Sequence, residues 1–148
     1  MYSVTKVLKN YPCSHRQPYH SGHCQFLHGY ERTFVLEFTA NELQIKTNFV
    51  IDFGGLEMKA IKKFLDEKFD HTTLLNSNDP EMDYFLQKDN ICFKIVILEN
   101  VGMEYSSKYV LEGVNTILQF SKDCVERGVR CFRVTTRENE KNSATYEK

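Results

Sequence analysis

The chain has 148 residues, of which 41% are hydrophobic and 26% charged, and this size and composition predict one globular domain over residues 1–148. A net charge of −1 argues against a nucleic-acid partner that is bound through bulk positive charge. No stretch reaches the length of a membrane span, and the first residues lack the apolar core of a signal peptide, so we expect no membrane partner and a cytoplasmic location.

Hydrophobic periodicity predicts a mixture of strands and helices, because β-branched and aromatic runs favour strands and apolar residues three or four positions apart favour helices. The expected elements are, in chain order, strands at 33–39 and 48–53, a helix at 56–69, a short helix at 81–86, a strand at 91–98, a helix at 105–121 and a strand at 129–135. In the last strand, Cys131 and Arg133 should face one side and Phe132 and Val134 the other. Since strands come first in succession, we predict the α+β class, a two-layer antiparallel sheet with two helices on one face.

Five cysteines without a C-x-x-C pair favour reduced thiols over a disulfide framework. Four of them are interpreted as small apolar structural residues, namely Cys13, Cys92, Cys124 and Cys131. Cys24 differs, because it alone lies among other reactive side chains.

Residues 15–30 hold an unusual density of groups that bind metals or carry thiol chemistry. They are His15, His20, His23, Cys24, His28 and Tyr30. Grouped ligands of this kind are typical of a zinc site or a thiol-based catalytic site, whereas the alternative is a surface loop that happens to be rich in histidine. Because residues two apart on a strand share a face, His28 and Tyr30 should point the same way.

An acid–imidazole pair closes the first predicted helix. Asp70 next to His71 can fix the imidazole tautomer and raise its basicity, although a histidine at a helix C-terminus is also favourable without any catalytic role. With a free cysteine, the pair forms a possible proton-transfer relay. Glu138, after the last predicted strand, reads on its own as a solvated strand-end acid.

Taken in order, these motifs resemble the 6-pyruvoyltetrahydropterin synthase / 6-carboxytetrahydropterin synthase family. The family pattern is an early zinc-binding histidine, C-x-x-x-H-G-H, D-F, L-D-H-x-x-L-N and a late glutamate before a tyrosine. The corresponding segments here are 13–15, 24–30, 52–54, 69–76 and 134–138 followed by Tyr146. The resemblance covers nearly the whole chain, and it is the ordered set that makes it specific.

The resemblance implies a role for each matching residue. His15 and His28 match zinc ligands, Cys24 matches the catalytic thiol, and Glu138 matches the anchor of the pterin ring. Asp70 and His71 match the rest of the catalytic relay. The implied fold is of the tunnelling type, in which sheets of several identical subunits close into an oligomeric barrel and the active sites lie between subunits.

The chain departs from the family pattern where the third zinc-binding histidine is expected, because Tyr30 stands there. Tyr30 can bind as a phenolate if the metal lowers a pKa of about 10. His20 or His23 can instead supply the missing nitrogen, which we rank slightly higher since neutral imidazole binds zinc at lower cost near pH 7. The third possibility is weak or absent zinc. The long 79–102 connection and the polar ending at 139–143 also suggest a divergent subgroup.

The implied function is a Zn²⁺-dependent lyase acting on the small-molecule pterin 7,8-dihydroneopterin triphosphate. A 6-carboxytetrahydropterin product, on the route to 7-deazapurines such as queuosine, is preferred over a 6-pyruvoyltetrahydropterin product. Arg16, Arg32 and Lys141 are candidates for binding the phosphates. The rival hypotheses are a non-catalytic pterin- or purine-binding homologue and a ligand-free structural barrel.

Overall fold

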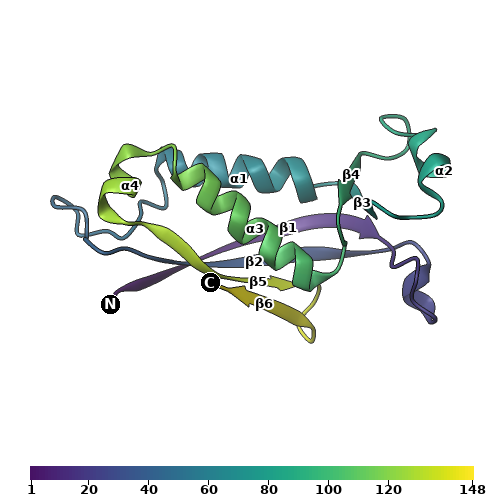
Figure 1. Cartoon of the computed structure of the whole chain (residues 1–148), viewed down its shortest axis with the longest axis horizontal. Helices are drawn as coiled ribbons and strands as arrows, with labels where there is room; N and C mark the ends of the chain where they lie inside the picture. Colours follow the sequence, from purple (N-terminus) through teal and green to yellow (C-terminus); the bar gives the residue numbers. More distant parts are fainter.

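The computed structural model describes the whole chain, Met1 to Lys148, as a long sheet with helices above it (Figure 1). In chain order the elements are β1 (Ser3–His15), the 3-10 helix η1 (His23–Gln25), β2 (His28–Thr39), α1 (Leu56–Phe69), β3 (Thr72–Asn76), α2 (Met82–Leu86), β4 (Ile95–Leu98), α3 (Met103–Leu118), α4 (Lys122–Arg127), β5 (Arg130–Arg137) and β6 (Ser143–Glu147).

The six strands form one mixed sheet in the order β4-β3-β1-β2-β5-β6. Three pairs are antiparallel, β1–β2, β2–β5 and β5–β6, whereas β1–β3 and β3–β4 are parallel. The α+β class is confirmed, but the wholly antiparallel sheet was a wrong prediction. Strand β3 follows β2 through helix α1 and runs opposite to β2, which makes it parallel to β1, and the connection through α2 brings β4 back parallel to β3.

The first strand, β1, was not predicted, although it is the longest one. Its pairing with β2 shifts register between Leu8 and Tyr11, and Asn10 adopts a positive φ of 72° at this point. The buried positions therefore change from even-numbered residues such as Leu8 to odd-numbered residues such as Tyr11 and Cys13. This change interrupts the regular alternation by which a half-buried strand is recognised in a sequence.

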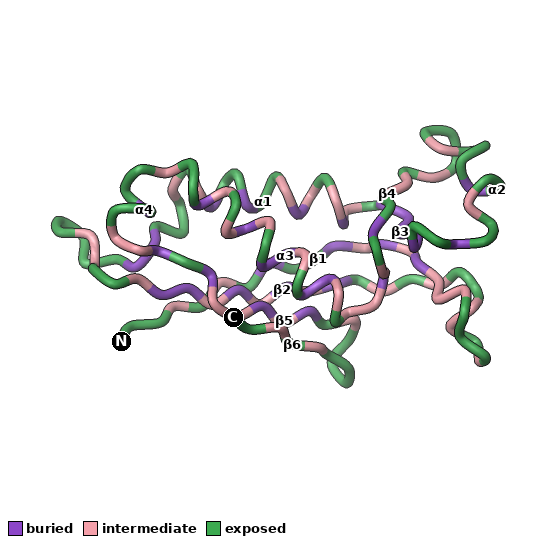
Figure 2. Tube along the Cα trace, viewed as in Figure 1, coloured by how far each residue is buried: buried purple, intermediate pink, exposed green.

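Helices α1 and α3 cover one face of the sheet and bury a shared hydrophobic core (Figure 1, Figure 2). The predicted helix at 56–69 is confirmed as α1, and α3 starts and ends slightly before the predicted bounds. The two helices approach closely at Gly113, where any larger side chain would collide with the ring of Phe64. Two short helices, α2 and α4, complete the fold, and no helix has the length and apolarity that a membrane span requires.

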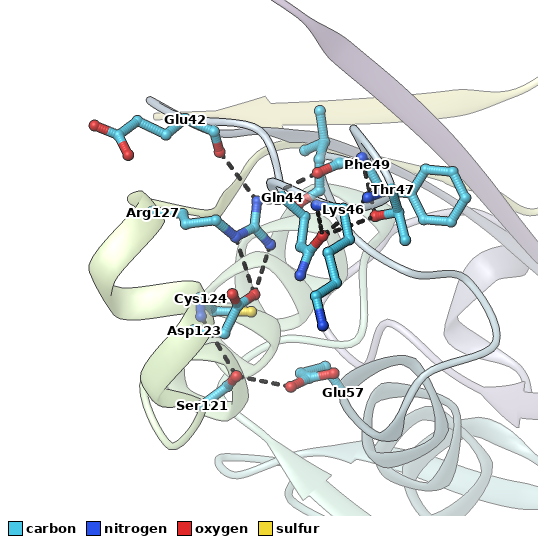
Figure 3. Close-up of polar contacts among 11 residues, drawn as sticks. Glu42, Gln44, Lys46, Thr47, Phe49, Glu57, Ser121, Asp123, Cys124 and Arg127 are labelled. Carbon is cyan, nitrogen blue, oxygen red and sulfur yellow. Dashed lines mark hydrogen bonds and ion pairs between the residues drawn. The ribbon is translucent and has the colours of Figure 1, made fainter.

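The segment 48–53 was predicted as a strand, and this prediction was wrong. Two of its carbonyl groups are bound by a side chain instead of a neighbouring strand: Arg127 of α4 donates to the carbonyl oxygens of Phe49 at 3.3 Å and Val50 at 3.1 Å (Figure 3). Arg127 also reaches the carbonyl of Glu42 at 3.0 Å and the carboxylate of Asp123 at 2.7 Å. One guanidinium thus ties α4 to the whole loop between β2 and α1.

Replacing Arg127 by Met should therefore destabilise the fold by about 2–4 kcal/mol, because it removes charge-assisted hydrogen bonds to several backbone carbonyls, one of them on the buried Val50. Urea unfolding measures the change. The control is Lys62→Met, which breaks an exposed ion pair with Asp66 and should alter stability by less than about 1 kcal/mol. Equal effects of the two substitutions would contradict this account of the loop.

Strand β5 does not keep the predicted alternation of faces. Its pairing with β2 shifts at Glu37/Phe38, so Cys131 and Val134 are both buried. The side-chain amide of Asn115, on α3, compensates for this irregularity by donating to the carbonyl of Cys131 at 2.8 Å and accepting from its N–H at 2.9 Å.

Three of the four cysteines interpreted as structural are buried: Cys13, Cys124 and Cys131. Burial raises the pKa of the Cys13 thiol and raises that of Cys131 to about 12, so both stay protonated and unreactive. The interpretation was wrong for Cys92, which is exposed.

Candidate functional site

His15 and His28 lie side by side at one end of the β1–β2 hairpin. His15 is the last residue of β1, His28 is the first of β2, and the antiparallel register pairs them directly. Their ring centroids are 4.4 Å apart. The ring of Tyr30 lies 5.9 Å from His15 and 5.7 Å from His28, so the expectation that His28 and Tyr30 share a face is confirmed. We refer to His15, His28 and Tyr30 as the His–Tyr cluster.

The imidazole of His15 is only 5% exposed, and its Nδ1 atom has no hydrogen-bond partner. Burial lowers the pKa of His15 to about 3, and electrostatic interactions with Arg32 and His28 act in the same direction. The ring is therefore neutral near pH 7, which is the form that binds metals. An unpaired buried ring nitrogen is costly unless a ligand satisfies it, so this atom indicates a binding site.

His28 also offers a free ring nitrogen. Its Nδ1 lies 2.6 Å from the carbonyl oxygen of Phe26, and a carbonyl only accepts, so Nδ1 carries a proton and Nε2 is the ring nitrogen left for a ligand. A second hydrogen bond of this kind is the usual way in which a metal-binding histidine is oriented. Two imidazole nitrogens and a phenol oxygen fit a zinc ion, which takes nitrogen and oxygen ligands.

Gly29, between His28 and Tyr30, is needed for the close pairing of the two strands. A Cβ atom at this position would lie 3.0 Å from the carbonyl oxygen of Cys13 on β1, so a side chain would push the strands apart. The short distances between the rings of the His–Tyr cluster depend on this close pairing of β1 and β2.

The other candidate ligands lie in the loop between β1 and β2. His20 and His23 are exposed, and Nδ1 of His20 accepts a hydrogen bond from the N–H of Gly22 at 2.9 Å. Cys24 is half-buried within η1. No three His, Cys, Asp or Glu side chains are grouped so that they could hold a metal ion, so none of these joins His15 and His28 as a third ligand within the chain.

Asp70 and His71 form the expected acid–imidazole pair directly after α1. Nδ1 of His71 lies 2.7 Å from a carboxylate oxygen of Asp70. His71 adopts a positive φ of 56°, which is uncommon for a residue with a side chain, and its N–H donates to the carbonyl of Pro12 at 2.8 Å. Strained backbone that the surroundings hold in place is often found at functional sites.

Strand alternation separates the surroundings of His71 from His15, although Tyr30 of the His–Tyr cluster borders the same depression as His71. His71 lines a depression of about 470 Å³ together with Ser14 and Thr73, whose hydroxyl oxygens are 2.9 Å apart. Because side chains alternate along a strand, Ser14 points away from the face that carries His15. His15 and Ser14, which borders the depression beside His71, therefore face different sides of the sheet.

Glu138 directly follows β5. The last residue of β5, Arg137, pairs with Thr33 of β2, so Glu138 comes at the position next to Arg32 in the same register. Its carboxylate accepts a hydrogen bond from the side chain of Asn142 at 3.1 Å. The position of Glu138 thus follows the sheet row of Arg32, and its charge acts on the Arg32 guanidinium.

Arg32 is a functional candidate that the sequence reasoning misassigned. Its side chain is fully buried and donates to Oγ of Ser106 and to the carbonyl of Val101, both at 2.7 Å, while its Nε has no partner. Burial lowers the pKa of Arg32, and nearby Cys13 and Glu138 oppose that effect. A buried side chain is not available for a phosphate. The sequence signal for this burial was that Arg32 lies two residues before Phe34, so the two side chains share the inward face of the strand.

The other two phosphate candidates differ in their surroundings. Arg16 is paired with the buried carboxylate of Asp79 at 2.9 Å, so its charge is already neutralised. Lys141 is exposed in the turn between β5 and β6 and remains accessible.

The mixed sheet, the two covering helices and the His–Tyr cluster define an α+β protein with a candidate metal-binding site. The profile of the family described as "6-pyruvoyl tetrahydropterin synthase" matches residues 4–148. The chain therefore belongs to the 6-pyruvoyl tetrahydropterin synthase family, as the ordered motifs indicated.

Solved structures share this fold over almost the entire chain. An uncharacterized protein from Wolinella succinogenes superimposes with a TM-score of 0.79 at 19% identity, covering 99% of this chain and 97% of the other. A 6-pyruvoyl tetrahydropterin synthase from Caenorhabditis elegans gives a TM-score of 0.64 at 17% identity, with 99% and 95% coverage.

Curated relatives match a shorter region. Proteins named 6-carboxy-5,6,7,8-tetrahydropterin synthase from Rickettsia conorii and Rickettsia felis are each 40% identical over 72 residues, which is 49% of this chain and 51% of the relative. The aligned region thus spans about half the length of these relatives.

Proposed function

We propose that the protein is a 6-carboxytetrahydropterin synthase-like lyase that acts on 7,8-dihydroneopterin triphosphate, with its active sites between copies of the chain. Family membership and the 40% identity to proteins of that name support the reaction class. The single structural observation that carries the proposal is the His–Tyr cluster, whose buried His15 nitrogen has no partner within the chain.

The His–Tyr cluster would hold a zinc ion through the free nitrogens of His15 and His28 and the oxygen of Tyr30. A bound zinc ion would polarise the hydroxyl groups of the substrate side chain and make nearby protons easier to remove. Tyr30 now ranks above His20 and His23 as third ligand, because its ring lies within 6 Å of both imidazoles, at 5.9 and 5.7 Å.

Side chains of the protein would carry out proton transfer and binding of the pterin ring. Cys24 would move a proton at one face of the pterin, and His71, held by Asp70, would move one at the other. Glu138 would accept two parallel N–H bonds from the pterin ring and so direct the side chain of the substrate toward the His–Tyr cluster. Since Ser14 beside His71 points away from His15, a neighbouring copy would supply the His71 that acts with the His–Tyr cluster, which requires a homo-oligomer.

The direct test incubates the protein with 7,8-dihydroneopterin triphosphate and identifies the product by mass, with and without a zinc chelator. A 6-carboxytetrahydropterin product supports the proposal and a place on a 7-deazapurine route such as that to queuosine. A 6-pyruvoyltetrahydropterin product would assign the other activity of the family, and an unchanged substrate would exclude both.

A non-catalytic pterin-binding protein is the second candidate function. It is favoured by the tyrosine at the third ligand position and by the buried positive charge of Arg32 on the same face, which opposes a doubly charged ion. Purified protein that lacks zinc but binds a dihydropterin would support this candidate.

Replacing Glu138 by Gln should weaken pterin binding by about 1.5–3 kcal/mol, because it removes a charge-assisted pair of hydrogen bonds. Isothermal titration with 7,8-dihydroneopterin measures the change. The control is Glu140→Gln in the same turn, whose exposed side chain should have no effect. An unchanged affinity of the Glu138 variant would mean that the pterin anchor lies elsewhere.

A further inference from the structure

The loop that carries Cys24 is held to the segment around α2 by an ion pair between Arg16 and the buried carboxylate of Asp79. Nε of Arg16 donates to one carboxylate oxygen of Asp79 at 2.9 Å and Nη2 donates to the other at 3.2 Å. The side chain of Asp79 is fully buried, and it also accepts from the N–H of Glu81 at 2.9 Å. A two-point pair with a buried carboxylate holds both partners in one orientation.

The same guanidinium reaches the backbone next to Cys24. Nη1 of Arg16 donates to the carbonyl oxygen of Gln25 at 3.3 Å. The N–H of the following residue, Gln17, donates to the carbonyl oxygen of Cys24 at 2.8 Å. The carbonyl groups of Cys24 and Gln25 are therefore held by Gln17 and Arg16, the two residues directly after β1.

Further contacts dock the loop against the segment between β3 and α3. The side-chain nitrogen of Gln17 donates to Asn100 at 2.9 Å, and the hydroxyl of Tyr19 donates to the carbonyl of Asn78 at 3.0 Å. The loop and the segment around α2 lie at the same end of the molecule (Figure 1). Asp79 is thus the buried centre of a contact surface between two loops.

We propose that Arg16 and Asp79 are a positioning pair for the Cys24 thiol. Asp79 fixes the guanidinium, and the guanidinium fixes the peptide group beyond Cys24. The inference rests on the catalytic role that the proposed function gives to Cys24. Proton transfer requires the thiol to lie within hydrogen-bond reach of the substrate, so a loosened loop slows the reaction even when the thiol is intact.

The test uses Asp79→Asn, which keeps the shape of the side chain but removes its charge, and Arg16→Lys, which keeps the charge but cannot bind Asp79 and Gln25 together. Each full-length variant is treated with iodoacetamide, and alkylation of Cys24 is measured by peptide mass analysis relative to the exposed Cys92 in the same sample. The matched control is Asp123→Asn, which breaks the ion pair with Arg127 on α4 at the other end of the molecule.

We expect both loop variants to raise the Cys24/Cys92 alkylation ratio by about tenfold, since local opening exposes the half-buried thiol. We expect kcat to fall by about 10- to 100-fold with a smaller change in KM. The control should leave the ratio and kcat unchanged.

An unchanged alkylation ratio in a variant that keeps the wild-type circular dichroism spectrum would overturn the proposal, as would a raised ratio with an unchanged kcat. If the wild-type protein does not convert 7,8-dihydroneopterin triphosphate at all, the proposed function fails. The alkylation ratio then still decides whether Arg16 and Asp79 hold the thiol.

Discussion

Cys24→Ala and His71→Ala should each abolish turnover, and mixing the two inactive variants should restore it. Each substitution removes a proton-transfer group, so each should lower turnover by about 10²–10⁴-fold. His71 lines a depression together with Ser14, which by strand alternation points away from His15. Under the proposed function, a complete site needs Cys24 of one chain and His71 of another.

The measurement unfolds equal amounts of the two variants, refolds them together and assays turnover of 7,8-dihydroneopterin triphosphate. With random assembly, a site is complete when one chain supplies an intact thiol and its neighbour an intact imidazole, so activity should recover to about a quarter of the wild-type level. A chain that carries both substitutions, refolded with Cys24→Ala, is the control and should stay inactive.

Failure to recover activity would contradict the arrangement between subunits, provided that size-exclusion chromatography shows the mixed chains in the same assembly. Activity would then depend on groups within a single chain, and the placement of His71 beside Ser14 would need another explanation.

The second large effect concerns Tyr30 and zinc. Tyr30→Phe should weaken zinc binding by more than about tenfold, because loss of a direct ligand should cost at least as much as loss of the outer hydrogen bonds that orient ligands. Tyr30→His should strengthen binding, since a neutral imidazole needs no proton removed near pH 7 whereas a phenol has a pKa of about 10.

Competition with a chromophoric chelator at fixed pH measures the affinity of each variant. His20→Ala and His23→Ala are the controls, because both side chains are exposed and outside the His–Tyr cluster, and both should bind zinc as the wild type does. The opposite pattern, with zinc retained in Tyr30→Phe and lost in either control, would make a loop histidine the third ligand.

Several features of this protein follow from local sequence alone. Helix α1 was predicted with its bounds because its apolar residues repeat with helical spacing over four turns. The Asp70–His71 pair at its end and the shared face of His28 and Tyr30 also need only neighbouring residues. The ordered motifs were sufficient for the family.

The tertiary structure decided the features that depend on residues far apart in the chain. Strand β1 was missed because its register shift interrupts the alternation, so the partner of His28 on β1 became evident only through strand pairing. Segment 48–53 has the composition of a strand, but Arg127, far away in the sequence, binds its carbonyl groups.

Charged residues show most clearly the difference between what local sequence determines and what the tertiary structure determines. By sequence, Arg16 and Arg32 are two cations near a candidate site, and both were considered for phosphate binding. In the fold, Asp79 neutralises Arg16 and the core encloses Arg32. Local periodicity determines which segments become helices and which residues share a face, because it depends on backbone geometry over a few residues. The environment of a side chain is determined by residues that only folding brings to it, and in this protein that environment distinguishes a ligand-binding group from a structural one.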